Sequence, residues 1–340
     1  MKKLGLLIGI FLLSCGSTQK SLEFTPTSLA NTITSAELKE HLYTYASDAF
    51  LGRETGTEGE TIAINYLKNE YKSLGIKGGM PNGDYFMPMS LKVSRENRTI
   101  DCNNVLAFIE GGEKPEEVLV ITAHLDHIGV ENDGQINNGA DDDGSGSVAI
   151  LEIAEAFQEA IKQGHRPKRS ILFLHVTGEE KGLLGSKYYT DNPVYPLENT
   201  VANLNIDMIG RIDKLHEDNP NYMYLIGSDI LSQDLHDVSE AMNQKYVNLD
   251  LDYRYNDPTT EVFERGRYRQ NNYYYRSDHY NFAKNDVPVI FYFNGTHADY
   301  HAPTDTVEKI EYELLEKRTR LIFLTAWEIV NRDDRLRLKE

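Results

Sequence analysis

Val118-Leu119-Val120-Ile121-Thr122 is a run of apolar and β-branched residues, and it predicts a strand buried on both faces of a sheet. The run leads into His124-Leu125-Asp126-His127, and the acidic loop Gly139-Ala140-Asp141-Asp142-Asp143-Gly144-Ser145-Gly146 follows it. Residues 147–161 then repeat apolar side chains at helical spacing. A buried strand, a loop and a helix in this order indicate a sheet with helices packed on it.

Further strands and helices alternate after this unit. Buried strands are predicted at 170–176, 201–206 and 287–293, and helices at 183–189, 231–242 and 312–330. The alternation predicts an α/β fold, namely a three-layer α/β/α sandwich with a central mixed, mostly parallel sheet. Residues 211–275 are polar and rich in Tyr and Asn, and we expect them to form an excursion near the site.

Composition limits the classes of protein that fit. The chain has 340 residues, of which 40% are hydrophobic and 26% charged, as in folded rather than disordered proteins. The formal net charge of −18 argues against nucleic acid as a partner. One large domain or two smaller ones fit this length. Since no linker or repeat is apparent, we expect a single domain over residues 34–335.

The N-terminus has the pattern of an export signal. Lys2 and Lys3 precede an apolar run over residues 4–13, which is shorter than the ~20 residues that span a bilayer. The run ends in Leu12-Leu13-Ser14-Cys15, which resembles a bacterial lipobox, where the cysteine becomes the lipidated first residue. We therefore predict a signal peptide over 1–15 and a flexible tether over 16–33. The protein would be exported and held in the cell envelope, in the periplasm or at the outer membrane, only by lipid on Cys15. Cys102 is then left alone, so no disulfide framework is expected.

Side chains that can bind metal follow each of the main predicted strands. In sheets of this kind function collects at the carboxyl ends of the strands. Each group is common by itself in turns or helix caps, but four such strand ends in one chain predict a shared site. Converging carboxylates need compensating charge, and imidazole with carboxylate favours zinc, although cobalt or manganese also fits. The groups are His124-Leu125-Asp126, Gly178-Glu179-Glu180, Asn205-Ile206-Asp207 and Tyr300-His301.

From about Asp48 onward the chain resembles the M28 zinc peptidases, a family that includes bacterial aminopeptidases. The resemblance rests on the motifs over residues 48–57, 124–126, 139–146, 178–186, 205–208, 277–279 and 300–301, which occur in the family's order. It implies the zinc exopeptidase fold and a site with two Zn²⁺ ions, whose ligands would be His124, Asp142, Glu180, Asp207 and His301.

The resemblance also implies individual roles. Asp142 would bridge both metals, and the peptide bond that follows it is expected to be cis. Glu179 would be the general base, Tyr300 would stabilise the oxyanion, and Asp126 would orient His124. Ser277-Asp278-His279 would line the cleft without an assigned step, and His127 and His175 are interpreted as structural.

The implied activity is hydrolysis of peptide substrates by metal-activated water, with Glu179 moving the proton. We expect an aminopeptidase that releases N-terminal residues. Two alternatives remain open: a glutaminyl cyclase-like transferase with a single zinc, and a non-catalytic ectodomain of the same fold. Ser145-Gly146 and the full ligand set with Glu179 favour the peptidase. The side-chain specificity and the oligomeric state are not indicated by the sequence.

Overall fold

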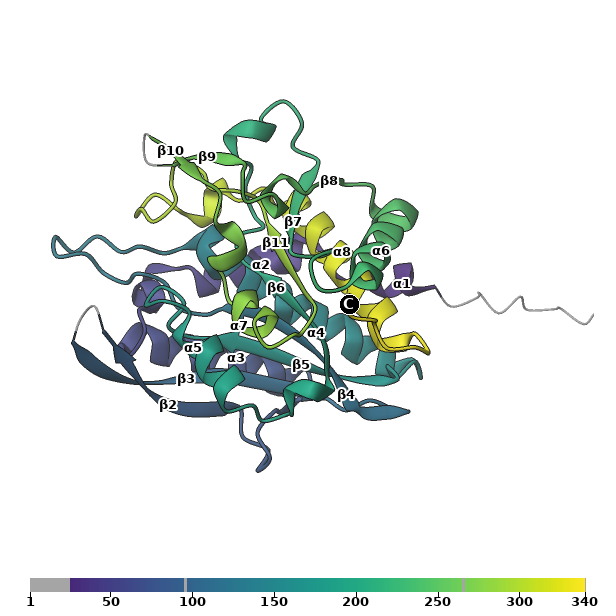
Figure 1. Ribbon diagram of the computed structural model, residues 1–340. Coiled ribbons are helices and arrows are strands. Elements are labelled where there is room, and N and C mark those ends of the chain that lie inside the picture. The colour runs from purple at the N-terminus through teal and green to yellow at the C-terminus, as the bar shows by residue number, and fades with distance from the viewer. Residues whose placement is uncertain (1–24, 95–96, 265–266, 340) are drawn as a thin grey trace, which may run out of the picture.

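This computed structural model describes residues 25–94, 97–264 and 267–339. Within them, a nine-stranded mixed sheet forms the centre of the fold (Figure 1). Its strand order is β1-β3-β5-β4-β6-β11-β7-β8, with β2 paired to β3, while β9 and β10 form a separate hairpin. The strands are β1 (Lys77–Gly78), β2 (Phe86–Val93), β3 (Arg98–Ile109), β4 (Lys114–His124), β5 (Arg169–Val176), β6 (Thr200–Ile206), β7 (Tyr222–Ile226), β8 (Asp250–Asp252), β9 (Glu261–Glu264), β10 (Arg267–Gln270) and β11 (Val289–Phe293).

The centre of the sheet is parallel. Strand β4 pairs in parallel with β5 and β6, and β6 pairs in parallel with β11. Antiparallel pairs flank this centre, with β3 beside β5 and β7 beside β11. The carboxyl ends of β4, β5, β6 and β11 therefore meet at one edge, which is where ligand sites form in sheets of this kind.

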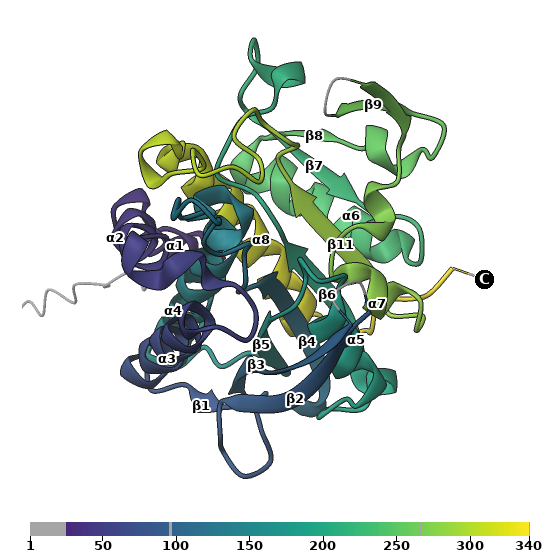
Figure 2. The same cartoon turned by 90° about the vertical axis from the view of Figure 1, so that its left-hand side faces the viewer.

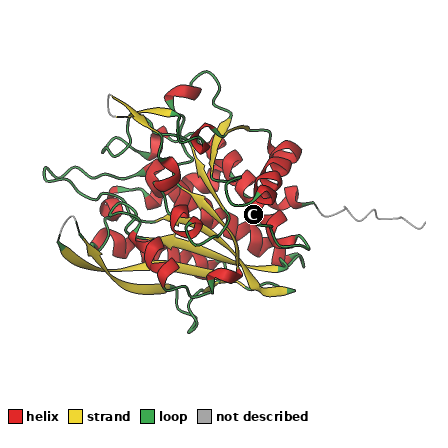
Figure 3. Ribbon diagram, in the orientation of Figure 1, coloured by secondary structure: helices red, strands yellow, loops and turns green. Residues whose placement is uncertain are grey.

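Helices cover both faces, so the predicted three-layer sandwich is confirmed (Figures 2 and 3). Helices α3, α4 and α8 contact one face of the sheet, and α1, α2 and α6 pack on α4 or α8, whereas α5 and α7 lie on the other face. The helices are α1 (Pro26–Ala30), α2 (Ser35–Tyr45), α3 (Glu58–Ser73), α4 (Gly146–Lys162), α5 (Leu184–Asp191), α6 (Gln233–Met242), α7 (His279–Ala283) and α8 (Tyr312–Asn331).

Strand β4 shows how the core is divided. Leu119 and Ile121 belong to the apolar cluster that includes α4 and α8. Val118 and Val120 belong to the cluster that includes α5 and α7. Because successive side chains of a strand point to opposite faces, a continuous apolar run is what a strand covered on both sides requires.

The structure corrects the predicted boundary of the tether. Residues 26–33 include helix α1, which contacts α4 and α8, and Leu29, Ala30 and Ile33 are buried. Burial of these apolar side chains favours a packed turn of helix over a flexible segment. The predicted signal peptide and residues 16–24 lie outside the described residues. Within the described residues, no helix is both long enough and apolar enough to cross a membrane.

Residues 211–275 were predicted to form a polar excursion, and this is wrong for β7. All five residues of β7 are buried, and the strand pairs with β11 inside the main sheet. Its Tyr-Met-Tyr-Leu-Ile sequence can be buried because both tyrosine hydroxyls form hydrogen bonds inside the protein. Tyr224 donates to Asp213, and Tyr222 donates to the carbonyl of Asn294.

Candidate metal centre

Four strand ends supply the candidate site. His124 is the last residue of β4, Glu179 and Glu180 follow β5, and Asp207 follows β6. His301 lies in the loop after β11. Because these strands end at the same edge of the sheet, residues far apart in the sequence come together.

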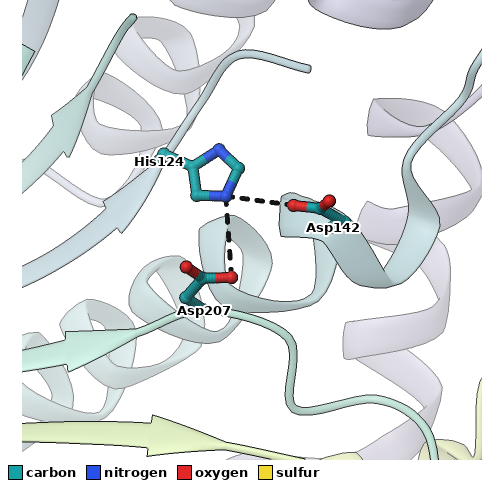
Figure 4. Close-up of side chains that lie close together, drawn as sticks. All are labelled: His124, Asp142 and Asp207. Carbon is teal, nitrogen blue, oxygen red and sulfur yellow. Dashed lines mark ion pairs between the residues drawn. The ribbon is translucent and has the colours of Figure 1, made fainter. Parts of the chain in front are cut away.

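His124, Asp142 and Asp207 form the first cluster (Figure 4). The Nε2 atom of His124 lies 3.1 Å from Oδ1 of Asp142 and 3.6 Å from Oδ1 of Asp207. All three residues are buried. Ligand atoms about 2.0–2.2 Å from a zinc ion lie about this far from one another.

The second carboxylate oxygen of Asp142 faces a different set of side chains. The Nε2 atom of His301 lies 3.1 Å from Oδ2 of Asp142 and 3.2 Å from Oε1 of Glu180. Asp142 therefore presents one oxygen to His124 and the other to His301. This is the orientation that a carboxylate bridging two ions needs.

The neighbouring aspartates point elsewhere, as the predicted bridging role of Asp142 requires. Asp141 accepts the backbone N–H of Gly210 at 2.6 Å. Asp143 accepts the backbone N–H groups of His124 and Met208, both at 3.1 Å. The expected cis peptide bond between Asp142 and Asp143 is present. The carboxylates of Asp141 and Asp143 thus bind backbone N–H groups around the acidic loop, and the carboxylate of Asp142 faces the candidate site.

Loop geometry at Asp142 depends on a residue that the sequence did not single out. The carboxylate of Asp305 accepts the backbone N–H groups of Asp141 and Asp142 at 3.0 and 3.1 Å. Arg53, which is fully buried, donates to the carbonyl oxygens of Asn138 and Gly139 on the same loop. The loop is therefore held from both sides.

Asp126 contacts His124 in a way that the sequence did not predict. The Nδ1–H of His124 donates to the backbone carbonyl of Asp126 at 2.9 Å, whereas the carboxylate oxygen Oδ1 is 3.8 Å away. The carbonyl thus sets the tautomer of the ring and leaves Nε2 free to bind metal.

The two histidines His124 and His301 hold protons strongly. Burial by itself would lower the pKa of His124, but Asp142 and Asp207 raise it well above its ordinary value. Burial by itself would also lower the pKa of His301, but Asp142 and Glu180 raise this pKa to about 10. A divalent ion at either cluster would take the place of these protons, because metal ligation needs a neutral imidazole.

Glu179 and Tyr300 line the same cleft as the first cluster. Burial raises the pKa of the Glu179 carboxyl well above its ordinary value, although His124 opposes the shift. A raised carboxyl pKa suits a group that takes and returns a proton near neutral pH. The ring of Tyr300 stacks on His301, with 3.9 Å between the ring centroids, and its hydroxyl accepts a hydrogen bond from Arg276 at 3.4 Å.

The donor set fits a metal, and zinc in particular. Oδ2 of Asp142 and Oε1 of Glu180 are buried and have no hydrogen-bond partner among the residues that the structure describes. Buried carboxylate oxygens without donors are costly unless a cation satisfies them. Imidazole nitrogen and carboxylate oxygen are ligands that zinc accepts.

Two contacts at the candidate site were not predicted from the sequence. Ser277, expected only to line the cleft, donates from Oγ to Oδ2 of Asp207 at 2.6 Å. His127, interpreted as structural, lies in a second cluster with Asp142 and Glu180, in which the ligand atoms lie within 4.8 Å of one another. The spacing His124-x-x-His127 was the available signal. By contrast, His175 bonds Tyr71 at 2.7 Å within the core, as expected of a structural residue.

The chain is similar in sequence to known proteins. The model of peptidase family M28 matches residues 104–326. Aminopeptidase NAALADL1 of Mus musculus is 35% identical over 158 residues, which cover 45% of this chain and 20% of that protein. Leupeptin-inactivating enzyme 1 of Streptomyces exfoliatus is 29% identical over 269 residues, covering 78% of this chain and 50% of that protein. The chain thus spans half or less of the length of these relatives.

The fold is also similar to solved structures. The crystal structure of the LapA aminopeptidase of Legionella pneumophila superposes with a TM-score of 0.67 at 20% identity. The match covers 90% of this chain and 75% of that chain. At this identity the likeness describes the fold alone.

Proposed function

Because the chain belongs to peptidase family M28, we propose that it is a metal-dependent peptidase, and that it acts as an aminopeptidase with two zinc ions. One observation carries the proposal. Asp142 turns one oxygen toward His124 and the other toward His301, both at 3.1 Å, so a single carboxylate connects two clusters of ligands.

Two sets of ligands that share Asp142 would each hold one ion. His124, Asp142 and Asp207 would bind the first, and Asp142, Glu180 and His301 would bind the second. Bound zinc lowers the pKa of water and polarises the substrate carbonyl. The remaining chemistry belongs to side chains of this protein.

Glu179 moves the proton. Its carboxylate takes a proton from the attacking water and later gives that proton to the leaving amine. Burial raises the pKa of Glu179, which makes its carboxylate a stronger base and supports the first of these steps. The hydroxyl of Tyr300 faces the same cleft, where it can donate to the oxyanion that develops on the substrate carbonyl.

Aminopeptidase activity is proposed over cleavage within a chain for two reasons. Several carboxylates converge at the cleft, and a protonated α-amine is the substrate group that such a site attracts. Proteins similar to this chain include aminopeptidases, which supports the same substrate class.

A peptidase assay with metal exchange tests the proposal. The purified protein is stripped with a chelator, reloaded with zinc, and assayed on aminoacyl-p-nitroanilides, dipeptides and N-acetylated peptides. We expect activity only after reloading, with two ions per chain, and cleavage of peptides with a free amine. Cleavage of N-acetylated peptides at an equal rate would contradict the aminopeptidase assignment, and no hydrolysis of any peptide would contradict the peptidase.

The same preparation tests the two rival functions. A glutaminyl cyclase would bind one zinc and convert N-terminal glutamine with loss of ammonia. A non-catalytic ectodomain would turn over neither substrate. The presence of Glu179 beside two connected ligand clusters favours the peptidase over both.

We also propose that the protein is exported and anchored by lipid on Cys15. The proposal depends on the charged, apolar and small-residue order of residues 2–15. An extracytoplasmic location suits an enzyme that degrades peptides from outside the cell.

A further inference from the structure

His127 is a buried histidine that the proposed mechanism does not use. Its side chain has no exposed surface, and both ring nitrogens lack a hydrogen-bond partner among the described residues. A buried polar group without a hydrogen-bond partner destabilises the folded state. Such a group in a folded protein indicates a partner that is not a protein hydrogen-bonding group, such as a bound ion.

The ring of His127 faces two oxygens that are also without hydrogen bonds. Its Nδ1 atom lies 3.1 Å from Oε1 of Glu180 and 3.8 Å from Oδ2 of Asp142. Both oxygens are buried, and neither has a hydrogen bond of good geometry within the described part of the chain. They are the same two oxygens that lie 3.2 and 3.1 Å from Nε2 of His301.

The backbone holds the ring in this place. Gly139 has a left-handed backbone (φ 54°), and a Cβ added to it would lie 2.6 Å from Cγ and Cδ2 of His127. The ring therefore packs directly on the glycine that opens the acidic loop. On another side, the ring of His301 meets it edge-on, with 5.8 Å between the ring centroids.

We propose that Nδ1 of His127 is a fourth protein ligand of the second ion, together with Asp142, Glu180 and His301. A neutral imidazole offers the lone pair that zinc binds, and an ion here would satisfy Nδ1 of His127, Oδ2 of Asp142 and Oε1 of Glu180 at once. The inference rests on the second ion of the proposed function.

Unequal affinity of the two sites follows from this ligand set. The first ion would have one imidazole and two carboxylates, whereas the second would have two imidazoles and two carboxylates. The second ion is therefore held more tightly. When zinc is added slowly to the stripped protein, it fills the second site first.

The test is metal retention in variants at His127. His127→Phe keeps a ring of similar size without a donor atom, and His127→Asn keeps an oxygen near the place of Nδ1. His175→Phe makes the same change at a buried histidine outside the site, where the lost partner is Tyr71. Zinc bound per chain is measured by mass spectrometry after dialysis against graded chelator concentrations.

We expect wild type and His175→Phe to retain two ions, and His127→Phe to lose one of them. Its affinity for that ion should fall at least ~10–100-fold, since even partners outside the ligand sphere have effects of this size. His127→Asn should lie between the two. Equal affinities in wild type and in both His127 variants would overturn the inference, whereas a wild type that binds no second ion would overturn the proposed function instead.

A measurement on the wild type keeps the inference testable if the variants do not fold. X-ray absorption spectra of the zinc-loaded protein count imidazoles around the ions. The proposal predicts three imidazoles for two ions, supplied by His124, His127 and His301. A count of two, in a protein with two ions bound, would exclude His127.

Discussion

The carboxylate of Asp126 accepts the backbone N–H of Glu179 at 3.2 Å. Its other oxygen accepts the hydroxyl of Thr55 at 2.8 Å, and its backbone carbonyl accepts Nδ1–H of His124. A single residue thus fixes both a candidate ligand at the end of β4 and the candidate base after β5. The two loops cannot move independently while these bonds last.

Replacement of Asp126 by asparagine should therefore impair turnover more than folding. The amide can accept only one of the two hydrogen bonds, so the backbone at Glu179 loses support. We expect kcat to fall ~10–100-fold with the fold intact by circular dichroism. Asp101→Asn, on strand β3, is the matched control and should retain full activity. Wild-type kcat in Asp126→Asn would show that the bond does not position the base.

Glu179→Gln separates the proposed base from the proposed ligands. The amide cannot take a proton from water, so we expect a loss of ~10²–10⁴-fold in kcat with both ions retained. Glu180→Gln should instead weaken metal binding, because Oε1 of Glu180 faces His301. If Glu179→Gln releases an ion, Glu179 is a ligand and the assignment of the base is wrong.

Ser277→Ala should loosen the first ion. Ser277 donates to Asp207 at 2.6 Å and accepts from Asn205 at 2.8 Å, so its loss leaves Asp207 poorly oriented. We expect the affinity for one zinc to fall ~10–100-fold, measured by competition with a chromogenic chelator. Ser239→Ala, at a buried serine of α6, should leave both affinities unchanged. Unaltered zinc affinity in Ser277→Ala would show that Ser277 does not position Asp207 for metal binding.

Glu152 should make the stability of the protein depend on pH. Burial, followed by the charges of Glu37 and Glu155, raises its pKa to about 8. Between the unfolded pKa of ~4.3 and this value, the folded state keeps a proton that the unfolded state has lost. The free energy of unfolding therefore falls as the pH rises through this window, by up to ~1.4 kcal/mol per unit from this group.

Glu152→Gln removes this titration. The free energy of unfolding of Glu152→Gln, measured with urea, should fall less steeply than that of wild type as the pH increases from about 5 to about 8. The difference between variant and wild type should therefore shift in favour of the variant. Glu159→Gln, on the same helix but partly exposed, should follow the wild-type pH dependence. A constant difference between Glu152→Gln and wild type would indicate that Glu152 is ionised in the folded protein throughout.

Cys15→Ala tests the lipid anchor. Only Cys15 and Cys102 occur in the sequence, and Cys102 is buried and unpaired. We expect Cys15→Ala to move from the membrane fraction to the soluble fraction, and Cys102→Ala to remain with the membrane. Membrane association of Cys15→Ala at the wild-type level would refute the lipoprotein assignment.

Much of the fold could be predicted from local pattern. The strands β4, β5, β6 and β11 are apolar runs of strand length, and α4 and α8 have long apolar faces. Strand β7 was missed because its two tyrosines and its polar flanks resemble a loop. The tyrosine hydroxyls are satisfied by Asp213 and Asn294, and neither contact has a sequence signature.

The sequence by itself determined which residue types stand at the strand ends and in what order, and these, with the family resemblance, predicted the candidate ligands and the candidate base. It could not determine how those residues face one another. That His127 points at Glu180, that Ser277 supports Asp207 and that Asp305 holds the acidic loop depend on contacts between segments far apart in the chain. Only the tertiary structure decided these relationships, because hydrogen bonds and metal sites require positions set to within a few tenths of an ångström, and packing of the whole sheet and its helices fixes such positions.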